Sequence, residues 1–280
     1  MERTLPEQFI SPLNYKYVVE LMKTETGLNL SDDKEYLIKG RLSKLPNKFN
    51  FKTLDQMLDE LRIKKSPLIL KEIVEALETY ETTFFRDPTQ FEYINNVFIP
   101  EFNKNFKSFQ TLRVWCAACS AGQEAYSILM NFKENPLSHS WNIQIVASDI
   151  SQLIVSKAEQ GIYSHFEVQR GLPIKLLIKY FTQIDTEWKI KEELRKNIQF
   201  RTHNLLHLPP QEGIYDLIFC RNVLIYFDKE TKKTVLNNLA KAGTKEAKLF
   251  LSRSEDIYQV VDGLSLIKDQ HGIYEFKHKV

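Results

Sequence analysis

The stretch Val-Trp-Cys-Ala-Ala-Cys-Ser-Ala-Gly-Gln-Glu-Ala-Tyr-Ser, from Val114 to Ser127, decides the fold of this chain. It is an apolar run that breaks at small residues and resumes as a helix with an acid in its first turn. Small residues at a strand-to-helix turn let backbone N–H groups and the helix N-terminus approach a ligand closely. The stretch therefore predicts a nucleotide-type cofactor site, although a strand-to-helix junction without any ligand would have a similar sequence.

Glu124 makes the expected ligand more specific. A carboxylate in the first helical turn would repel a pyrophosphate but would suit a cationic amino group. The phosphate-binding fingerprint G-x-G-x-x-G is also absent from this turn. S-adenosylmethionine therefore fits the pattern better than a dinucleotide does.

The composition is that of a globular protein with a substantial core. With 280 residues, 43% of them hydrophobic, the chain can form one large domain or two modest ones. Its 38 basic and 36 acidic residues leave a net charge of +2, too little for the broad basic surface that nucleic-acid binding requires. The sequence has neither an N-terminal apolar signal core nor an apolar run of about 20 residues. We expect a cytoplasmic protein that binds no nucleic acid and does not insert into a membrane.

The cysteines Cys116, Cys119 and Cys220 are odd in number and form no disulfide framework. Cys116 and Cys119 form a C-x-x-C motif. The sequence has no second such motif and no nearby histidine pair, so it does not favour a zinc site. A redox role would require the motif to lie away from a buried strand end. We expect packing cysteines and no metal site.

Residues 11 to about 78 have apolar positions at helical spacing and predict a small helical domain. Its second helix is expected from residue 33 to about residue 48, after a cap at Ser31 or Asp32. That helix is basic, with Lys34, Lys39, Arg41, Lys44 and Lys48. Such a charge run is either a solvated face or a docking surface for an acidic partner.

From residue 110 onward, short apolar runs alternate with amphipathic helices, which predicts a doubly wound, mostly parallel sheet. Strands are expected at residues 112–118, 143–147, 215–220 and 248–251. Ligands bind such sheets at the carboxyl ends of the strands. At that edge, Asp149 follows the second of these strands, and Arg221 and Asn222 follow the third. Asp149 would hold a ribose diol, or it would cap the helix that starts near Ser151.

Residues 180–190 and 197–204 interrupt this pattern with alternating apolar and polar residues. The alternation predicts short strands in a small antiparallel insert at the edge of the sheet. An exposed strand edge can accept a peptide as an additional strand. A decorative insertion would have the same pattern.

Ordered motifs along the chain give it a resemblance to a known family. They are Thr82-Thr-Phe-Phe-Arg-Asp, Ala118-Cys-Ser-Ala-Gly-Gln-Glu-Ala-Tyr-Ser, Ala147-Ser-Asp-Ile, Gly161-Ile-Tyr, Tyr180-Phe, Asn204-Leu-Leu, Phe219-Cys-Arg-Asn-Val-Leu-Ile-Tyr-Phe-Asp and Ser252-Arg-Ser-Glu. From about residue 12 to about residue 275, the chain resembles the CheR-type chemotaxis receptor protein-glutamate O-methyltransferases.

The resemblance implies a class I S-adenosylmethionine-dependent methyltransferase fold. It implies an N-terminal helical domain at residues 1–78 and a methyltransferase domain at residues 79–280, with a small antiparallel β-subdomain inserted at about residues 162–202. The implied activity is methyl transfer to glutamates of a chemoreceptor in sensory adaptation, giving glutamyl methyl esters and S-adenosylhomocysteine. The alternative is a cofactor-binding signalling or adaptor module with little or no transferase activity.

The resemblance also assigns roles to individual residues. The cofactor site would comprise Thr82, Arg86, Glu124 at the methionine amino end, Asp149 at the ribose, Asn204 and Leu205 at the adenine, and Arg221 with Asn222. Arg86 and Tyr226 would contact the substrate glutamate, unless Arg86 forms a structural ion pair with Asp87 or Glu81. The receptor's cytoplasmic helical domain would dock on Lys39, Arg41, Lys44 and Lys48, and the insert is a possible site for a receptor C-terminal peptide.

The chain departs from the family pattern at three positions near these motifs. Tyr80 stands where the family often has a small polar residue, Ala125 replaces a proline, and Arg253 replaces a histidine. None of these changes removes a residue assigned to the cofactor, but together they weaken any expectation about the catalytic rate.

Overall fold

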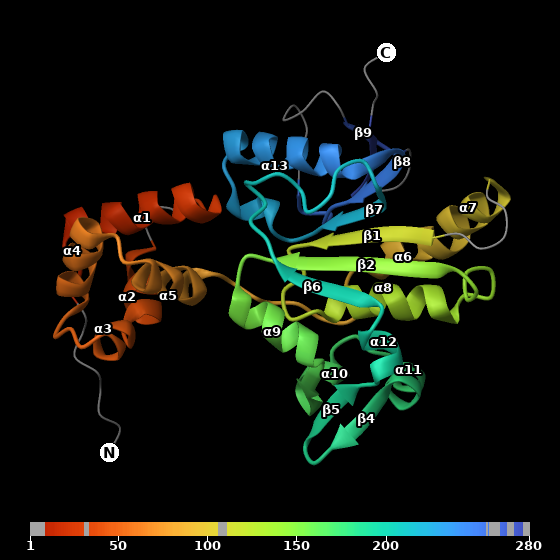
Figure 1. Ribbon diagram of the computed structural model, residues 1–280, viewed down its shortest axis with the longest axis horizontal. Coiled ribbons are helices and arrows are strands. Elements are labelled where there is room, and N and C mark those ends of the chain that lie inside the picture. Colours follow the sequence, from red (N-terminus) through yellow and green to blue (C-terminus); the bar gives the residue numbers. More distant parts are fainter. Residues whose placement is uncertain are drawn as a thin grey trace. The chain divides into compact units, whose positions relative to one another are not determined.

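Figure 1 shows the computed structural model of the protein, which describes residues 9–30, 34–105, 111–255, 257, 264–267 and 272–276. The chain divides into two compact units, Met1–Thr79 with Tyr226–Asp228, and Tyr80–Ile225 with Lys229–Val280. The expected cap residues Ser31 and Asp32 lie outside the described residues.

The first unit is built from helices, as predicted. They are α1 (Pro12–Thr26), α2 (Glu35–Leu42), α3 (Leu45–Lys48), α4 (Leu54–Lys64) and α5 (Pro67–Leu77). Apolar stripes of these helices, including Leu54, Met57 and Leu58 on α4, form a buried cluster of their own. The all-helical N-terminal domain is therefore confirmed.

The prediction of one continuous basic helix from residue 33 to 48 is wrong. Helix α2 ends at Leu42, and α3 begins at Leu45 with Pro46 in its first turn. Pro46 has no N–H to donate to the carbonyl of Leu42 and its ring would clash there, so a helix cannot continue through this point.

The second unit contains a 7-stranded sheet in the order β6-β2-β1-β7-β8-β10-β9. Its strands are β1 (Thr111–Ala117), β2 (Asn142–Asp149), β6 (Ile198–Thr202), β7 (Tyr215–Cys220), β8 (Gly243–Phe250), β9 (Leu264–Leu266) and β10 (Ile273–Phe276). The strands from β6 to β8 are parallel, and β10 is antiparallel to both of its neighbours. The four strands expected from the apolar runs are all present, and the doubly wound, mostly parallel sheet is confirmed.

Further helices of this unit precede β1 or follow its strands. They are α6 (Pro88–Tyr93), the π-helical turn η1 (Ile94–Phe98), α7 (Ile99–Asn105), α8 (Gln123–Glu134), α9 (Gln152–Gln160) and α13 (Lys229–Ala242). The short 3-10 turn η2 (Leu224–Tyr226) follows β7 and leads out of the unit.

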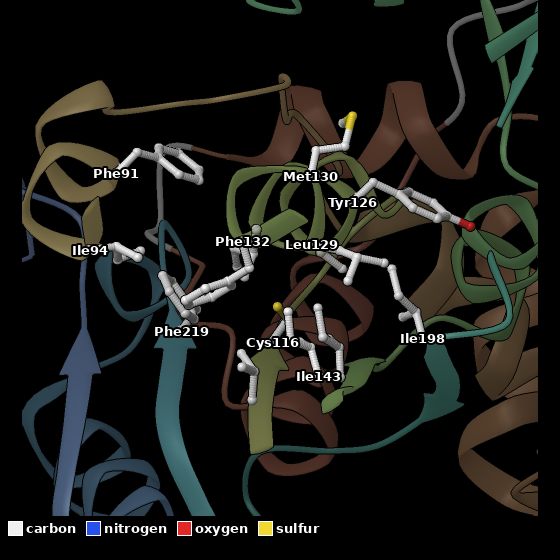
Figure 2. Close-up of a cluster of buried hydrophobic side chains, with 14 of the residues drawn as sticks. Phe91, Ile94, Cys116, Tyr126, Leu129, Met130, Phe132, Ile143, Ile198 and Phe219 are labelled. Carbon is white, nitrogen blue, oxygen red and sulfur yellow. The ribbon is translucent and has the colours of Figure 1, made fainter. Parts of the chain in front are cut away.

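A buried cluster of apolar side chains joins β1 to α8 and its neighbours. Figure 2 shows Cys116 from β1 close to Phe132 and Leu129 of α8, among the other members of this cluster. Cys116, Cys119 and Cys220 are free and buried, and burial raises the pKa of each thiol well above its usual value. The expectation of packing cysteines is confirmed for all three.

The insert forms a separate 3-stranded antiparallel sheet with the order β3-β5-β4. Its elements are β3 (Ile162–Ser164), α10 (His165–Gln169), α11 (Ile174–Tyr180), β4 (Phe181–Ile184), β5 (Glu187–Ile190) and α12 (Glu192–Arg195). In Figure 1 it lies at the end of the large sheet that carries β6. The antiparallel β-subdomain is confirmed.

The expectation that the insert extends to residue 202 is wrong, because residues 198–202 form β6, which pairs in parallel with β2 in the large sheet. An edge strand is covered on one face only. It therefore has the same alternating pattern as an antiparallel strand, and the pattern could not separate the two.

Tyr163 and Gly171 are among the residues that join the insert to the rest of its unit. Tyr163 on β3 donates its hydroxyl to the carbonyl of Ala121 at 2.7 Å. Gly171, with φ +85°, lies so close to Phe84 that a Cβ would be 2.1 Å from the Phe84 carbonyl oxygen. Any side chain at position 171 would displace the backbone at Phe84.

Candidate functional site

The turn between β1 and α8 is held in a strained conformation. Ala118 and Ser120 have φ of 65° and 49°, a region that side-chain-bearing residues rarely adopt. Neighbouring segments hold the turn in place: Cys119 N–H donates to the carbonyl of Ser148 at 2.8 Å, and the Ser120 hydroxyl donates to the carbonyl of Tyr80 at 3.0 Å. Such strain persists only where surrounding contacts fix it, and it is common at ligand sites.

Tyr80 contacts this turn through its backbone carbonyl, which accepts from the Ser120 hydroxyl.

Asp149, at the carboxyl end of β2, lies against this turn. Its Oδ2 accepts the backbone N–H of Ser120 at 2.8 Å, and its Oδ1 accepts that of Ser151 at 3.3 Å. The N-cap of α9 is Ser151, whose side chain accepts from Ile154 N, so the alternative of Asp149 as that cap is wrong. An ionised carboxylate offers about four acceptor positions, which is the chemistry that ligand hydroxyls require.

Glu124 lies in the first turn of α8 and binds a buried arginine. Arg221, which follows β7, donates from Nη1 to Glu124 Oε2 at 2.7 Å and from Nη2 to Asp87 Oδ2 at 2.6 Å. Nη2 also donates to the carbonyl of Arg86 at 2.7 Å. The arginine thus ties the loop that precedes α6 to the carboxyl ends of β1 and β7.

Burial and the opposite charges of this cluster both act on the pKa values of Glu124 and Arg221. Burial raises the pKa of Glu124, and the charge of Arg221 opposes that rise. For Arg221, burial lowers the pKa, but Glu124 and Asp87 together outweigh burial and raise it. Arg221 therefore stays charged between the carboxylates of Glu124 and Asp87.

Arg86 and Thr82 are half-buried in the loop between α5 and α6. Phe85 in this loop has φ 48°, and its N–H donates to the Ser127 hydroxyl at 3.0 Å. Arg86 donates to the backbone carbonyl of Glu81 at 3.3 Å. An Arg86 ion pair was the structural alternative, but the carboxylate of Asp87 binds Arg221 and that of Glu81 binds Arg170 at 3.2 Å. Arg86 therefore forms neither of the two expected ion pairs.

The loop with Asn204 and Leu205 follows β6. Asn204 accepts the N–H of Leu206 on its side chain and that of His207 on its carbonyl, both at 3.0 Å. The buried Asn238 of α13 donates its amide to the carbonyls of Leu205, Leu206 and His207 at 3.0, 3.1 and 2.9 Å. Sequence reasoning missed Asn238, although an amide inside an apolar stripe was the available signal.

Arg221 and Asn222 follow β7, and Asn222 has φ 60°. The next two backbone N–H groups, of Val223 and Leu224, both donate to the buried carboxylate of Glu255 at 2.8 Å. Sequence reasoning used Glu255 only as part of a family motif. In the same motif, Arg253 donates to the Thr89 hydroxyl at 3.0 Å.

Tyr226 belongs with the helical unit, where its backbone carbonyl accepts from Asn29 N–H at 2.9 Å. Its side chain is partly exposed.

Three of the four basic residues expected to dock a receptor form contacts within the helical unit. Arg41 donates to the carbonyls of Leu77 and Glu78, at 2.6 and 2.9 Å, where α5 ends. Lys39 pairs with Glu35 and Lys48 with Glu72, whereas Lys44 is exposed. Arg41 therefore has a structural role of its own.

The residues at this edge of the sheet fit S-adenosylmethionine by their chemistry. Two carboxylates, Glu124 and Asp149, lie on either side of a turn of small residues, which suits a cationic amino group and a ribose diol. Within the described part of the chain, the buried Arg221 Nε and Gln123 Oε1 find no hydrogen-bond partner. Buried polar atoms are seldom left this way, so both are available to a ligand or to water.

None of the helices in the ranges that the structure describes is long and apolar enough to span a bilayer.

Comparison with known proteins gives matches over most of the chain. Residues 13–77 match the family described as CheR methyltransferase, all-alpha domain, and residues 80–273 match CheR methyltransferase, SAM binding domain. A chemotaxis protein methyltransferase, Cher2, of Pseudomonas putida is 34% identical over 93% of this chain and 96% of its own length. Chemotaxis protein methyltransferase 1 of Pseudomonas aeruginosa is 34% identical over 88% of this chain and 91% of its own. A chemotaxis protein methyltransferase of Vibrio parahaemolyticus is 32% identical over 96% of this chain and 98% of its own length. The chain belongs to the CheR methyltransferase family.

Proposed function

We propose that this protein transfers the methyl group of S-adenosylmethionine to glutamate side chains of a chemoreceptor in sensory adaptation. The products are glutamyl methyl esters and S-adenosylhomocysteine. One observation carries the proposal: both CheR domains match in order, and relatives named chemotaxis protein methyltransferases align with this chain over nearly its whole length.

The reaction requires little acid or base catalysis from the protein. S-adenosylmethionine supplies a methyl group activated by the positive charge on its sulfur. The substrate glutamate is already ionised at neutral pH, so its carboxylate attacks the methyl carbon without a general base. The bond from methyl carbon to sulfur breaks as the ester bond forms, and its electron pair stays on sulfur. The protein must therefore hold the reacting groups in line.

The roles of individual residues form part of the proposal. Glu124 binds the amino end of the cofactor and Asp149 the ribose, while Asn204 and Leu205 frame the adenine. Thr82, Arg221 and Asn222 complete the cofactor site. Arg86 orients one oxygen of the substrate carboxylate and leaves the other free to attack, and Tyr226 donates its hydroxyl to the substrate. The contacts of Arg221 with Glu124 and Asp87 support the first role, because they hold the Glu124 carboxylate in place beside the turn after β1.

The activity can be tested directly. The protein is incubated with S-adenosylmethionine labelled with tritium in its methyl group and with membranes that contain candidate receptors. We expect label in the receptor band that base releases as methanol, which identifies an ester and excludes N-methylation. Addition of S-adenosylhomocysteine should suppress the label.

The alternative is a signalling or adaptor module that binds the cofactor with little or no transfer. It would bind S-adenosylhomocysteine in a calorimetric titration but give no base-labile label with any receptor. The same titration tests the cofactor itself, because a protein that fails to bind S-adenosylhomocysteine cannot act by the proposed route.

We further propose that the helical domain at residues 1–78 docks the cytoplasmic helical part of the receptor, and that residues 79–280 form the catalytic domain. The basic residues Lys39, Arg41, Lys44 and Lys48 would face the receptor. The β-subdomain would bind a receptor C-terminal peptide along a strand edge. These roles place the protein in the cytoplasm, where that part of a receptor lies.

Docking can be separated from folding by the choice of lysines. Arg41 supports the end of α5, so the variant changes Lys44 and Lys48 to glutamate instead. We expect a severalfold loss of transfer to receptor, steeper at low salt, with unchanged affinity for S-adenosylhomocysteine. Lys64→Glu with Lys71→Glu changes the net charge equally, elsewhere on the same unit, and should leave transfer unaffected. Equal losses in the two variants would contradict docking by Lys44 and Lys48.

A further inference from the structure

Glu255 is a carboxylate buried where two parallel strands end. It is 3% exposed and follows β8, the neighbour of β7 in the sheet. Its Oε1 accepts the N–H groups of Val223 and Leu224 at 2.8 Å, and its Oε2 accepts that of Ser252 at 2.7 Å. The side chain therefore connects the loop after β7 to the loop after β8.

Burial of a carboxylate is costly unless hydrogen bonds replace its hydration. Burial raises the pKa of Glu255, and the backbone N–H groups around it counteract that rise. Each of these donors is a main-chain group, so the carboxylate fixes backbone and not side chains.

The loop after β7 has the shape of a backbone anion site. Asn222 is left-handed with φ 60°, and the next two N–H groups, of Val223 and Leu224, point to one carboxylate. Successive N–H groups in such a conformation form concavities that bind anions. Here the anion belongs to the protein itself. The loop starts at Arg221, whose guanidinium binds Glu124 and Asp87.

We propose that Glu255 is a positioning residue of the cofactor site. Its carboxylate holds the loop at residues 222–224, and this loop sets the backbone from which Arg221 reaches Glu124 and Asp87. The proposal rests on the cofactor roles proposed above for Glu124 and Arg221. Glu255 itself acts through the loop and through Arg221.

The test uses Glu255→Gln in the full chain. The amide keeps the shape but removes the negative charge that the N–H groups of Val223, Leu224 and Ser252 bind, and its NH2 group cannot accept from any of them. We expect amide exchange at Val223 and Leu224 to accelerate at least about tenfold, while residues 215–220 of β7 keep their protection. We also expect the Kd for S-adenosylhomocysteine to rise about tenfold at 25 °C. Circular dichroism at the same temperature checks that the variant is folded.

Glu275→Gln is the matched control. Glu275 lies on β10 in the same sheet, and its carboxylate forms a surface ion pair with Lys248 at 3.1 Å. This control should leave both exchange and affinity unchanged. If Glu255→Gln does not fold, Glu255→Asp keeps the charge but shortens the reach by one methylene, and the same exchange and affinity changes are expected of it.

A double variant with Glu124→Gln separates positioning from a merely structural role. If Glu255 acts through Arg221 and Glu124, the double variant loses less affinity than the product of the two single losses. Unchanged affinity in Glu255→Gln, or losses that simply multiply, would overturn the proposal. The exchange measurement needs no ligand. A normal affinity in Glu124→Gln alone would therefore count against the proposed cofactor site, whereas unchanged exchange at residues 223–224 would count against Glu255.

Discussion

At the scale of single residues, strain and buried charge gather around the strand ends. Ala118, Ser120, Phe85, Asp87 and Asn222 all have positive φ without being glycine. A non-glycine residue in this conformation destabilises the fold by about 1–3 kcal/mol, and it persists only where surrounding contacts fix it. They flank the buried arginine or the turn after β1, which is where the cofactor is proposed to bind.

Glu124→Gln should weaken S-adenosylhomocysteine binding about 10- to 100-fold, because a hydrogen bond to a charged group contributes about 1.5–3 kcal/mol. Isothermal titration measures this change. Glu159→Gln, on the exposed side of α9, is the control and should bind normally. A normal affinity in Glu124→Gln would contradict its assignment to the amino group.

Gly122→Ala should destabilise the fold more than Gly213→Ala. Both glycines have positive φ, but a Cβ at Gly122 would lie 2.9 Å from the Cβ of Ala158, whereas a Cβ at Gly213 meets nothing within 4 Å. We expect a loss of about 1 kcal/mol for Gly213→Ala and about 1–3 kcal/mol more for Gly122→Ala. Urea unfolding of the two variants provides the comparison, and equal losses would show that crowding at Gly122 is relieved.

At the scale of elements, hydrogen bonds from helix residues fix the conformation of neighbouring segments. Asn238 on α13 gathers three carbonyls of the loop at residues 205–207, and Ser164 with Glu167 forms a capping box at the start of α10. These contacts fix the loop at residues 205–207 and the start of α10.

Asn238→Asp should loosen the loop proposed to frame the adenine, because a carboxylate beside three carbonyl oxygens has nothing to donate. We expect the Kd for S-adenosylhomocysteine to rise at least about fivefold. Asn237→Asp makes the same change at the exposed neighbouring position and should have no effect. The Kd values of the two variants for adenosine alone should differ by the same factor, because the affected loop is proposed to frame the adenine.

Glu167 predicts a pH dependence of the insert. Burial alone would raise its pKa, but hydrogen bonds from Lys157 and Ser164 outweigh burial and hold the pKa below the usual value of 4.5. Its ionised form therefore stabilises the fold above about pH 4.5, and this contribution is lost as the pH falls through the lower folded-state pKa. Glu167→Gln should cost about 1 kcal/mol at pH 7. In urea unfolding, the difference from the unmodified protein should shrink toward pH 3, and a constant difference would contradict the assignment.

The elements also show how far a sequence can be interpreted. The apolar runs predicted β1, β2, β7 and β8, because buried parallel strands are nearly continuous in apolar residues. They could not place β6, whose half-buried alternation is shared with the insert. The motifs indicated Glu124, Arg221 and Asp149, but not that Asp87 shares Arg221. That contact joins residues 134 positions apart and leaves no local pattern.

At the scale of the whole molecule, each unit has its own buried cluster. Saturating S-adenosylhomocysteine at about 100 times its Kd should stabilise the unit that binds it by about 2.7 kcal/mol. Hydrogen exchange should slow about 100-fold in β1 and β2 and stay unchanged in α4 of the helical unit. Equal protection of α4 would show that the two units unfold together.

The contacts of Tyr163 and Gly171 bear on how such enzymes can be recombined. A chimera that receives the insert of another protein would also have to receive a hydroxyl that reaches the Ala121 carbonyl and a glycine against Phe84. Without them, the exchanged module would disturb the turn after β1 and the loop that carries Arg86. An exchanged insert therefore has to keep both the hydroxyl of Tyr163 and the glycine at position 171.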